Sequence, residues 1–530
     1  MSAPQDDAVL PPGLSAVQFE RALHALASAV GEAAVLRAEQ AAEFRDPYSF
    51  PGWTEHWPSA VVLPASVADV QAVVRVARQY RLPLWTTSLG KNNAYGGPAP
   101  LVRGSVVVSL RRLNRVLEVN EELAYAVVEP GVSFFDLCAE LSRRGSALWA
   151  SVPDLGWGSV IGNTVDHGVG YLPGGNHADS MCGLEVVLAS GEVIRTGMGA
   201  MAGNQAWHAH RRGFGPAVDG LFTQSNFGIV TKMGKWLTPR PEVYAPVEVR
   251  AARESDLEAL IDTTRPLLLD GTVTNLPLLG TLTGAASMVK PRAQWHPGPG
   301  PLPPEFYAAA RAELGLGFWN LRMALYGSEA VVDAQLARVK GAFAKGVPGA
   351  EVAARKVPGA DVSEQTLTTH PERVQAGLPG LLLLDSLQWW GGVGGHLDFS
   401  PVAPLSGVHA RRLVSMLRPE IEGAGLDFWP GTIMTPRSFY MVSPLLYDTT
   451  NEAQVKAAYD VYRRLVRLTG EAGYGLYRGH LEFMDDIAAR YDWGDRALLR
   501  LYGTLKDALD PDGILSPGKQ GIWPSTTRQS

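Results

Sequence analysis

A glycine-rich loop that directly follows a short apolar strand places the strongest constraint on the fold. The predicted strand covers residues 82–87, and the loop after it contains Gly90, Gly96 and Gly97. Glycine lets a backbone approach a ligand closely, and successive backbone N–H groups at the end of a strand form an anion-binding nest. The spacing matches neither a Rossmann Gly-x-Gly-x-x-Gly motif nor a Walker A loop. The residues alone favour a phosphate-binding loop and a structural turn about equally.

A second glycine-rich segment, residues 153–171, has a single carboxylate near its start. Its backbone can wrap closely around a flat ligand because it contains five glycines: Gly156, Gly158, Gly162, Gly168 and Gly170. Asp154 would then lie beside whatever the segment encloses. The spacing alone favours a simpler interpretation, in which Asp154 forms a turn after Pro153. Asp166 and His167 are interpreted as structural.

Two later segments carry side chains with distinctive chemistry. His396 lies within the run 394–401, and strand alternation places it on the same side as Asp398. No second histidine, cysteine or carboxylate cluster has metal-site spacing, so no metal is expected and His396 by itself is interpreted as structural. Tyr477 and Arg478 are adjacent. A guanidinium with phenol hydroxyls around one oxygen stabilises a phenolate, although an arginine paired with a surface acid is a common alternative.

The order of predicted elements indicates an α+β fold with more than one domain. A chain of 530 residues is too long for one ordinary core. Helices and strands alternate without a dominant parallel pattern, which favours α+β over a doubly wound sheet. Capping residues and apolar periodicity predict helices at 16–30, 67–77, 134–142, 330–343, 410–422 and 452–470. Strands are predicted at 82–87, 106–108, 125–128, 184–188, 192–196 and 318–325. The prolines at 239–241 predict a linker, and those at 295–304 a surface loop.

Charge and apolar patterning exclude two classes of partner. The formal net charge of −6 gives no basic footprint for nucleic acid. No window is a continuous apolar run long enough to span a bilayer, so no membrane partner is expected. Residues 1–7 lack the basic and apolar stretches of a signal peptide. Cys138 and Cys182 are predicted to be buried thiols, and a cytoplasmic protein is expected.

Taken together, segments 90–97, 153–163 and 394–401 resemble the vanillyl-alcohol oxidase family, most closely its bacterial eugenol-oxidase-like members. The resemblance extends over nearly the whole chain. It implies a two-domain flavin oxidase with a bipartite FAD-binding domain and an α+β substrate cap. The expected boundaries are 1–245 for the first part of the FAD-binding domain, 246–475 for the cap and 476–530 for the C-terminal return.

The resemblance also assigns roles to individual residues. Tyr95, Tyr477 and Arg478 match the residues that bind the phenolic oxygen, and Asp154 matches the aspartate near flavin N5, a candidate general base. His396 matches the histidine bonded covalently to the flavin 8α carbon. The other residues implied to bind FAD are Ser88, Gly90, Lys91, Asn92, Asn93, Pro153, Gly158, Ser159, Gly162, Asn163, Gly228, Ile229, Val230 and Lys519. The substrate pocket is expected to include Trp429, Ile433 and Asp398, and Trp389 and Phe428 are assigned either to this pocket or to the cap core. Asp398 replaces a small residue of the close relatives, which puts the polarity of the pocket in question.

The activity implied is an FAD-dependent oxidation of para-substituted phenols, among them 4-hydroxybenzylic alcohols such as vanillyl alcohol and 4-alkyl and 4-allyl phenols such as eugenol. Hydride transfer to flavin N5 gives a quinone methide, and O2 is reduced to hydrogen peroxide. One alternative is a 4-alkylphenol dehydrogenase that passes electrons to a cytochrome; another, less favoured, is a non-catalytic ligand-binding protein. A homodimer or a dimer-based oligomer is expected.

Overall fold

The computed structural model describes residues 9–528. The prediction that residues 1–7 carry no signal peptide therefore lies outside the described residues. Of the described helices, none combines the length and apolar character needed to cross a lipid bilayer. Within the same residues there is no cluster of three or more His, Cys, Asp or Glu side chains arranged to hold a metal ion.

The first layer is a four-stranded sheet covered by two amphipathic helices. Its strand order is β1-β2-β4-β3, with β2, β4 and β3 parallel. Helices α1 and α2 begin where predicted, because Ser15 and Ser66 accept hydrogen bonds from the backbone of their first turns. Their apolar faces bury against this sheet. The bounds are β1 Val35–Arg37, β2 Ala60–Val62, β4 Val106–Ser109, β3 Leu84–Thr87, α1 Ala16–Val30 and α2 Val67–Tyr80.

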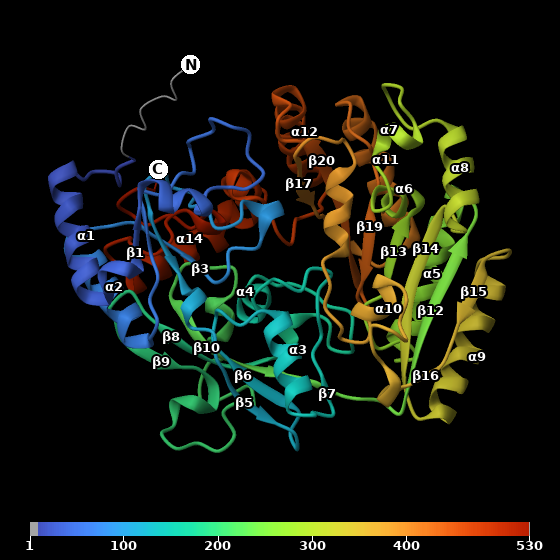
Figure 1. Cartoon of the computed structure of the whole chain (residues 1–530), viewed down its shortest axis with the longest axis horizontal. Coiled ribbons are helices and arrows are strands. Elements are labelled where there is room, and N and C mark those ends of the chain that lie inside the picture. The colour runs from blue at the N-terminus through green and yellow to red at the C-terminus, as the bar shows by residue number, and fades with distance from the viewer. Residues whose placement is uncertain (1–8, 529–530) are drawn as a thin grey trace.

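A second, five-stranded antiparallel sheet continues the same half of the molecule (Figure 1). Its order is β5-β6-β10-β8-β9, and the predicted hairpin is confirmed as the antiparallel pair β8 and β9. The short pair β11 and β7 lies beside it. The bounds are β5 Val116–Asn120, β6 Tyr125–Val128, β10 Ile229–Trp236, β8 Met181–Val187, β9 Val193–Arg195, β7 Leu148–Trp149, β11 Thr238–Pro239, α3 Phe134–Arg143 and α4 Val160–Val165.

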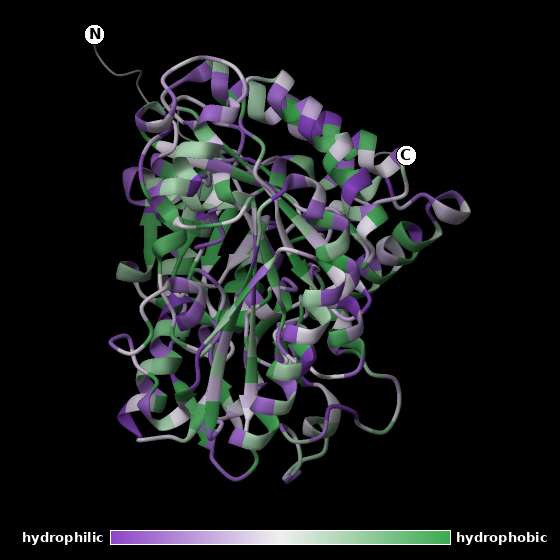
Figure 2. Cartoon of the chain, turned by 90° about the vertical axis from the view of Figure 1, so that its right-hand side faces the viewer, coloured by the Kyte–Doolittle hydropathy of each residue, from purple (hydrophilic) through white to green (hydrophobic). Residues whose placement is uncertain are grey.

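The other half is built on one nine-stranded antiparallel sheet, at the right of Figure 1. The main path is β15-β12-β14-β13-β19-β20-β17, with β16 paired to β12 and β18 to β20. The strands are β12 Val243–Ala251, β13 Leu278–Thr281, β14 Trp319–Gly327, β15 Glu351–Ala354, β16 Val357–Pro358, β17 Gly394–Phe399, β18 Val402–Pro404, β19 Gly431–Met434 and β20 Ser438–Asp448. Green, hydrophobic residues dominate several of the central strands in Figure 2, and purple residues gather on outer helices and loops.

Helices of the second half pack on this sheet through buried apolar residues. The strand predicted at 318–325 is β14, and the helices predicted at 330–343, 410–422 and 452–470 are α9, α11 and α12. The helix bounds are α5 Leu257–Leu269, α6 Leu282–Ser287, α7 Arg292–Trp295, α8 Pro304–Leu314, α9 Glu329–Gly346, α10 His370–Val374, α11 Gly407–Gly423 and α12 Glu452–Glu471. Trp389 and Phe428 pack in the cores of this half, which decides the alternative left open above.

The C-terminal segment returns to the first sheet after α13 (Met484–Ala488) and α14 (Trp493–Leu509). Leu84 of β3 accepts from the backbone N–H of Ser516 at 2.8 Å and donates to Ile514 at 2.7 Å. The side chain of Asn226 donates to the carbonyls of Ser516 and Ile522, each at 2.9 Å. These bonds attach the tail beside the first glycine-rich loop. The exact domain boundaries at 245 and 475 stay a prediction.

Candidate active site

One large cavity of about 440 Å³ lies where the two halves meet, a size typical of a small-molecule site. It is lined by the end of β3, the loops after it, the start of β10, strands β17 and β19, and the tail. Every residue predicted to bind FAD or substrate lines it: Ser88, Gly90, Lys91, Asn92, Asn93, Tyr95, Pro153, Asp154, Gly158, Ser159, Gly162, Asn163, Gly228, Ile229, Val230, His396, Asp398, Trp429, Ile433, Tyr477, Arg478 and Lys519. The structure therefore brings together residues more than 400 positions apart.

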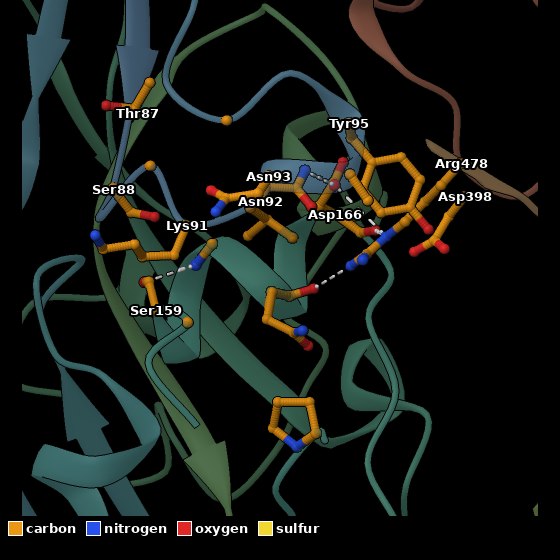
Figure 3. A pocket seen from close by; sticks show the side chains of 18 of the residues that line it. Thr87, Ser88, Lys91, Asn92, Asn93, Tyr95, Ser159, Asp166, Asp398 and Arg478 are labelled. Atoms are coloured by element: carbon orange, nitrogen blue, oxygen red, sulfur yellow. Dashed lines mark hydrogen bonds and ion pairs between the residues drawn. The ribbon is translucent and has the colours of Figure 1, made fainter. Parts of the chain in front are cut away.

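The two glycine-rich segments pack against each other at one end of this cavity (Figure 3). Gly90 has φ +66°, which a side chain would strain. A Cβ added at Gly162 would lie 2.3 Å from Oγ of Ser88, so a larger residue would force the Ser88 side chain to move. Ser159 caps α4 by accepting from the Gly162 N–H at 2.9 Å. This close backbone approach fits the phosphate groups of FAD, because glycine lets a backbone come close to a ligand.

Tyr95, Tyr477 and Arg478 converge at the other end of the cavity. The guanidinium carbon of Arg478 lies 5.6 Å from the ring centre of Tyr95 and 5.5 Å from that of Tyr477. Burial raises the pKa of both tyrosines, so both hydroxyls stay protonated. Burial lowers the pKa of Arg478, but Asp166 and the two tyrosines raise it by more. The net pKa lies above its ordinary value, and the guanidinium stays charged. Two neutral donors beside one fixed cation form a site suited to an oxyanion.

The backbone of the second glycine-rich segment fixes the orientation of Arg478. Its Nε donates to the carbonyl of Asp166 at 2.5 Å, and its Nη2 donates to the carbonyl of Asn163 at 3.2 Å. The Asp166 carboxylate lies 3.5 Å from the same Nε. Asp166, interpreted from the sequence as structural, thus supports the cation of the site and lines the cavity.

Asp154 is held by three donors from distant parts of the chain. Its Oδ1 lies 3.1 Å from Nη2 of Arg322 and 3.0 Å from Nε2 of His370, and its Oδ2 accepts from the hydroxyl of Tyr171. Burial raises the pKa of Asp154, but Arg322, His370 and Tyr171 outweigh it and lower the pKa below the ordinary value of 3.8. The carboxylate is therefore ionised and is a weak proton acceptor in the resting site.

His396 presents a neutral imidazole to the cavity from β17. Its ring centre is 5.2 Å from that of Tyr48, and its Nε2 is 3.8 Å from Oδ1 of Asp398. Burial lowers the pKa of His396, and Asp398 only partly offsets this. The Nδ1 atom is buried and has no hydrogen-bond partner within residues 9–528. A neutral, incompletely bonded imidazole fits a site of attachment, because an unprotonated nitrogen is the nucleophilic form.

The residues that sequence reasoning missed are the partners of Asp154. Arg322 lies on β14 and His370 begins α10, 168 and 216 positions from Asp154. Neither is near a motif, so no local pattern signals its role. Tyr48 likewise comes from the N-terminal segment, 348 positions before His396. These contacts follow from how the two halves pack against each other.

Comparisons with known proteins show what the whole chain is similar to. The family model of an FAD-binding domain matches residues 58–197, and the model of the C-terminal domain of FAD-linked oxidases matches residues 443–520. The flavoprotein subunit of hydroxylating 4-cresol dehydrogenase from Pseudomonas putida is 35% identical, over 98% of this chain and 98% of its own. The 1'-carboxy-chondrochloren decarboxylase of Chondromyces crocatus is 33% identical, over 96% of this chain and 98% of its own.

A solved structure matches just as widely. The 4-ethylphenol oxidase from Gulosibacter chungangensis, in complex with isoeugenol, superposes with a TM-score of 0.93 at 36% identity, covering 98% of this chain and 100% of its own. This agreement confirms the two-domain α+β flavin-oxidase fold predicted from the sequence. Because relatives above 30% identity extend over almost the whole chain and both FAD-domain models match it, the chain belongs to the vanillyl-alcohol oxidase family of FAD-dependent oxidoreductases.

Proposed function

We propose that the protein is an FAD-dependent oxidase of para-substituted phenols, namely 4-hydroxybenzylic alcohols and 4-alkyl and 4-allyl phenols. The observation that carries the proposal is the convergence of Tyr95, Tyr477 and Arg478 at one end of a cavity that also contains His396 and Asp154. Similarity to a 4-ethylphenol oxidase and to a 4-cresol dehydrogenase subunit supports this substrate class.

The residues of the chain bind and polarise the substrate. The two tyrosine hydroxyls donate to the phenolic oxygen, and the Arg478 charge stabilises it as phenolate, which pushes electron density toward the para side chain. FAD, when bound, supplies the hydride acceptor. Ionised Asp154 stabilises the positive charge that develops on the carbon losing hydride. Loss of hydride makes the hydroxyl proton on that carbon strongly acidic, so even this weakly basic carboxylate is the group proposed to take the proton from an alcohol or from added water.

Molecular oxygen is the proposed electron acceptor, with hydrogen peroxide as the product. The histidine at position 396 supports this choice. In the family that the sequence resembles, phenol dehydrogenases attach the flavin through a tyrosine instead. The 35% identity to a 4-cresol dehydrogenase flavoprotein subunit favours a second candidate, a dehydrogenase that passes electrons to a partner protein. Oxygen uptake and peroxide release with 4-ethylphenol separate the two. One peroxide per substrate supports the oxidase, and turnover with an artificial acceptor alone supports the dehydrogenase.

A covalent bond between His396 and FAD is the first prediction. Acid precipitation of the purified protein should leave yellow, fluorescent flavin in the pellet, because the neutral imidazole of His396 is free to form the bond. His396→Ala should bind FAD without the bond and should be reduced more slowly, since the tether is expected to raise the flavin potential. Flavin found only in the supernatant of the parent protein would rule out the attachment.

The homodimer and the cytoplasmic location expected from the resemblance and the sequence stay predictions. Light scattering of the purified holoprotein determines the number of chains per particle. A monomer at micromolar concentration would contradict the first of these expectations.

A further inference from the structure

Within residues 9–528, three carboxylates line the cavity: Asp166 supports Arg478, and the other two have different surroundings. Asp154 is bonded by Arg322, His370 and Tyr171. Asp398 follows His396 by two positions on β17, and its side chain, 18% exposed, opens onto the cavity. Ionised carboxylates offer about four acceptor positions, so the number of donors around each decides what a ligand can add.

The neighbours of Asp398 leave part of its acceptor capacity open. The Tyr95 hydroxyl is a polar neighbour that lowers the pKa of Asp398, and His396 Nε2 lies 3.8 Å away, beyond hydrogen-bonding distance. Burial raises the pKa of Asp398 by more than His396, Arg478 and Tyr95 lower it, so the pKa lies above its ordinary value. A buried carboxylate with few donors is costly, and a ligand that supplies a donor removes that cost.

Asp398 also lies at the end of the cavity assigned to the phenolic oxygen. Figure 3 shows its carboxylate beside Tyr95 and Arg478, whereas Ser88, Lys91 and Ser159 lie at the opposite end. A group that reaches Asp398 from a bound phenol must therefore start next to the phenolic oxygen, at the ortho carbon. A hydroxyl there donates to the carboxylate, but a methoxy group has no proton to donate and turns its lone pairs toward the negative charge.

We propose that Asp398 is a specificity-determining residue that selects para-substituted catechols, phenols with a second hydroxyl ortho to the first, over the corresponding ortho-methoxy phenols. This inference rests on the proposed function and narrows its substrate class. The ortho hydroxyl donates to Asp398, and the adjacent phenolate oxygen is bound by Tyr477 and Arg478. Tyr95 donates to the phenolate as well, and the ortho hydroxyl supplies Asp398 with a donor of its own.

Binding of three small phenols to the holoprotein tests the inference without turnover. Catechol, guaiacol and phenol have no para side chain to oxidise, and anaerobic titration of the flavin absorbance gives their dissociation constants. The parent protein should bind catechol about tenfold to a hundredfold more tightly than guaiacol, the range expected of a hydrogen bond to a charged group. The ratio is measured on one preparation, so folding and flavin content do not affect it.

Two variants assign the preference to the carboxylate. In Asp398→Ala the catechol-to-guaiacol ratio should fall to within about threefold, because no acceptor remains. In Asp398→Asn the affinity for guaiacol should rise relative to that for catechol, since an amide N–H can donate to the methoxy oxygen. The same order should appear in the anaerobic rates of flavin reduction by 4-ethylcatechol and 4-ethylguaiacol, which avoids the spontaneous oxidation of catechols in air.

The outcomes distinguish this inference from the proposed function. Equal binding of catechol and guaiacol by the parent protein, or an unchanged preference in Asp398→Ala, overturns the role of Asp398. Reduction of the flavin by 4-ethylphenol in the same sample shows that the proposed phenol oxidation stands. If none of the three phenols binds and 4-ethylphenol does not reduce the flavin, the proposed function fails and the inference fails with it.

Discussion

Replacing Asp154 with asparagine is expected to slow flavin reduction by a 4-hydroxybenzyl alcohol about a hundredfold to ten-thousandfold, the usual range for a lost acid–base group. The substitution keeps the size of the side chain but removes the negative charge that faces Arg322 and His370. Rapid mixing without oxygen is the appropriate measurement, because it separates reduction from reoxidation. A fully flavinylated variant reduced at the parent rate would exclude Asp154 from the mechanism.

The loss must be distinguished from the cost of breaking a buried ion pair. Asp427 is paired to Arg292 at 2.6 Å, is more deeply buried than Asp154 (side chain 4% exposed against 16%), and does not line the cavity. Asp427→Asn is therefore a matched control: it should lower the unfolding temperature, with reduction within a few-fold of the parent. Equal slowing in both variants would indicate a general structural effect.

The pH dependence of reduction provides a second measure of Asp154. Its pKa in the folded protein lies below the ordinary 3.8, because its three donors favour the charged form. Protonation of Asp154 should therefore not slow flavin reduction at any pH above 3.8. Its contribution to stability has the sign of a depressed acid: fully present above the ordinary pKa, and lost as pH falls through the lower folded value. A fall in rate with an apparent pKa of 5 to 6 that disappears in Asp154→Asn would contradict this assignment.

Removing the charge at Arg478 should abolish most phenolate recognition. In Arg478→Gln, kcat/KM for 4-ethylphenol should fall about a hundredfold to a thousandfold or more, because a buried charged partner of an anion is lost. Phenolic inhibitors bound to the parent protein should show a depressed phenol pKa by absorbance, and this depression should disappear in the variant. The methyl ether of the substrate should be nearly inert with the parent protein, because it cannot form the phenolate.

A milder variant separates the loss of phenolate recognition from a structural disturbance of the site. Arg478 also donates to the carbonyls of Asp166 and Asn163, so its replacement disturbs the second loop. Tyr477→Phe removes one hydroxyl and keeps the ring, and it should cost about tenfold. Tyr440 packs against Tyr477 with ring centres 4.6 Å apart and ring planes tilted by 33°, but it does not line the cavity, which makes Tyr440→Phe the control. Equal turnover of phenol and methyl ether would exclude phenolate-driven chemistry.

Local patterns in the sequence were sufficient to predict many of the elements. Ser15, Ser66 and Ser133 start helices because their hydroxyls satisfy backbone N–H groups of the first turn, a signal that needs no tertiary contact. The hairpin of β8 and β9 and the long helix α12 follow from apolar periodicity in the same way. Pro246, the first residue of the expected cap, lies inside β12. It is tolerated opposite the gap between β15 and β16, where its missing N–H has no partner to bond.

The candidate site likewise combines features that local sequence predicts with features that only the packing of distant segments creates. The glycine-rich loops, His396 and the Tyr477–Arg478 pair are short-range features, and the sequence by itself determined them because each motif matches the family over adjacent residues. The surroundings that set their chemistry are long-range. Arg322 and His370 hold Asp154 as a charged, weakly basic group, and Asp398 keeps an open acceptor beside Arg478. Only the tertiary structure decided these points, because burial and partner charges fix a carboxylate's protonation, and both arise when the two halves of the chain close around the cavity.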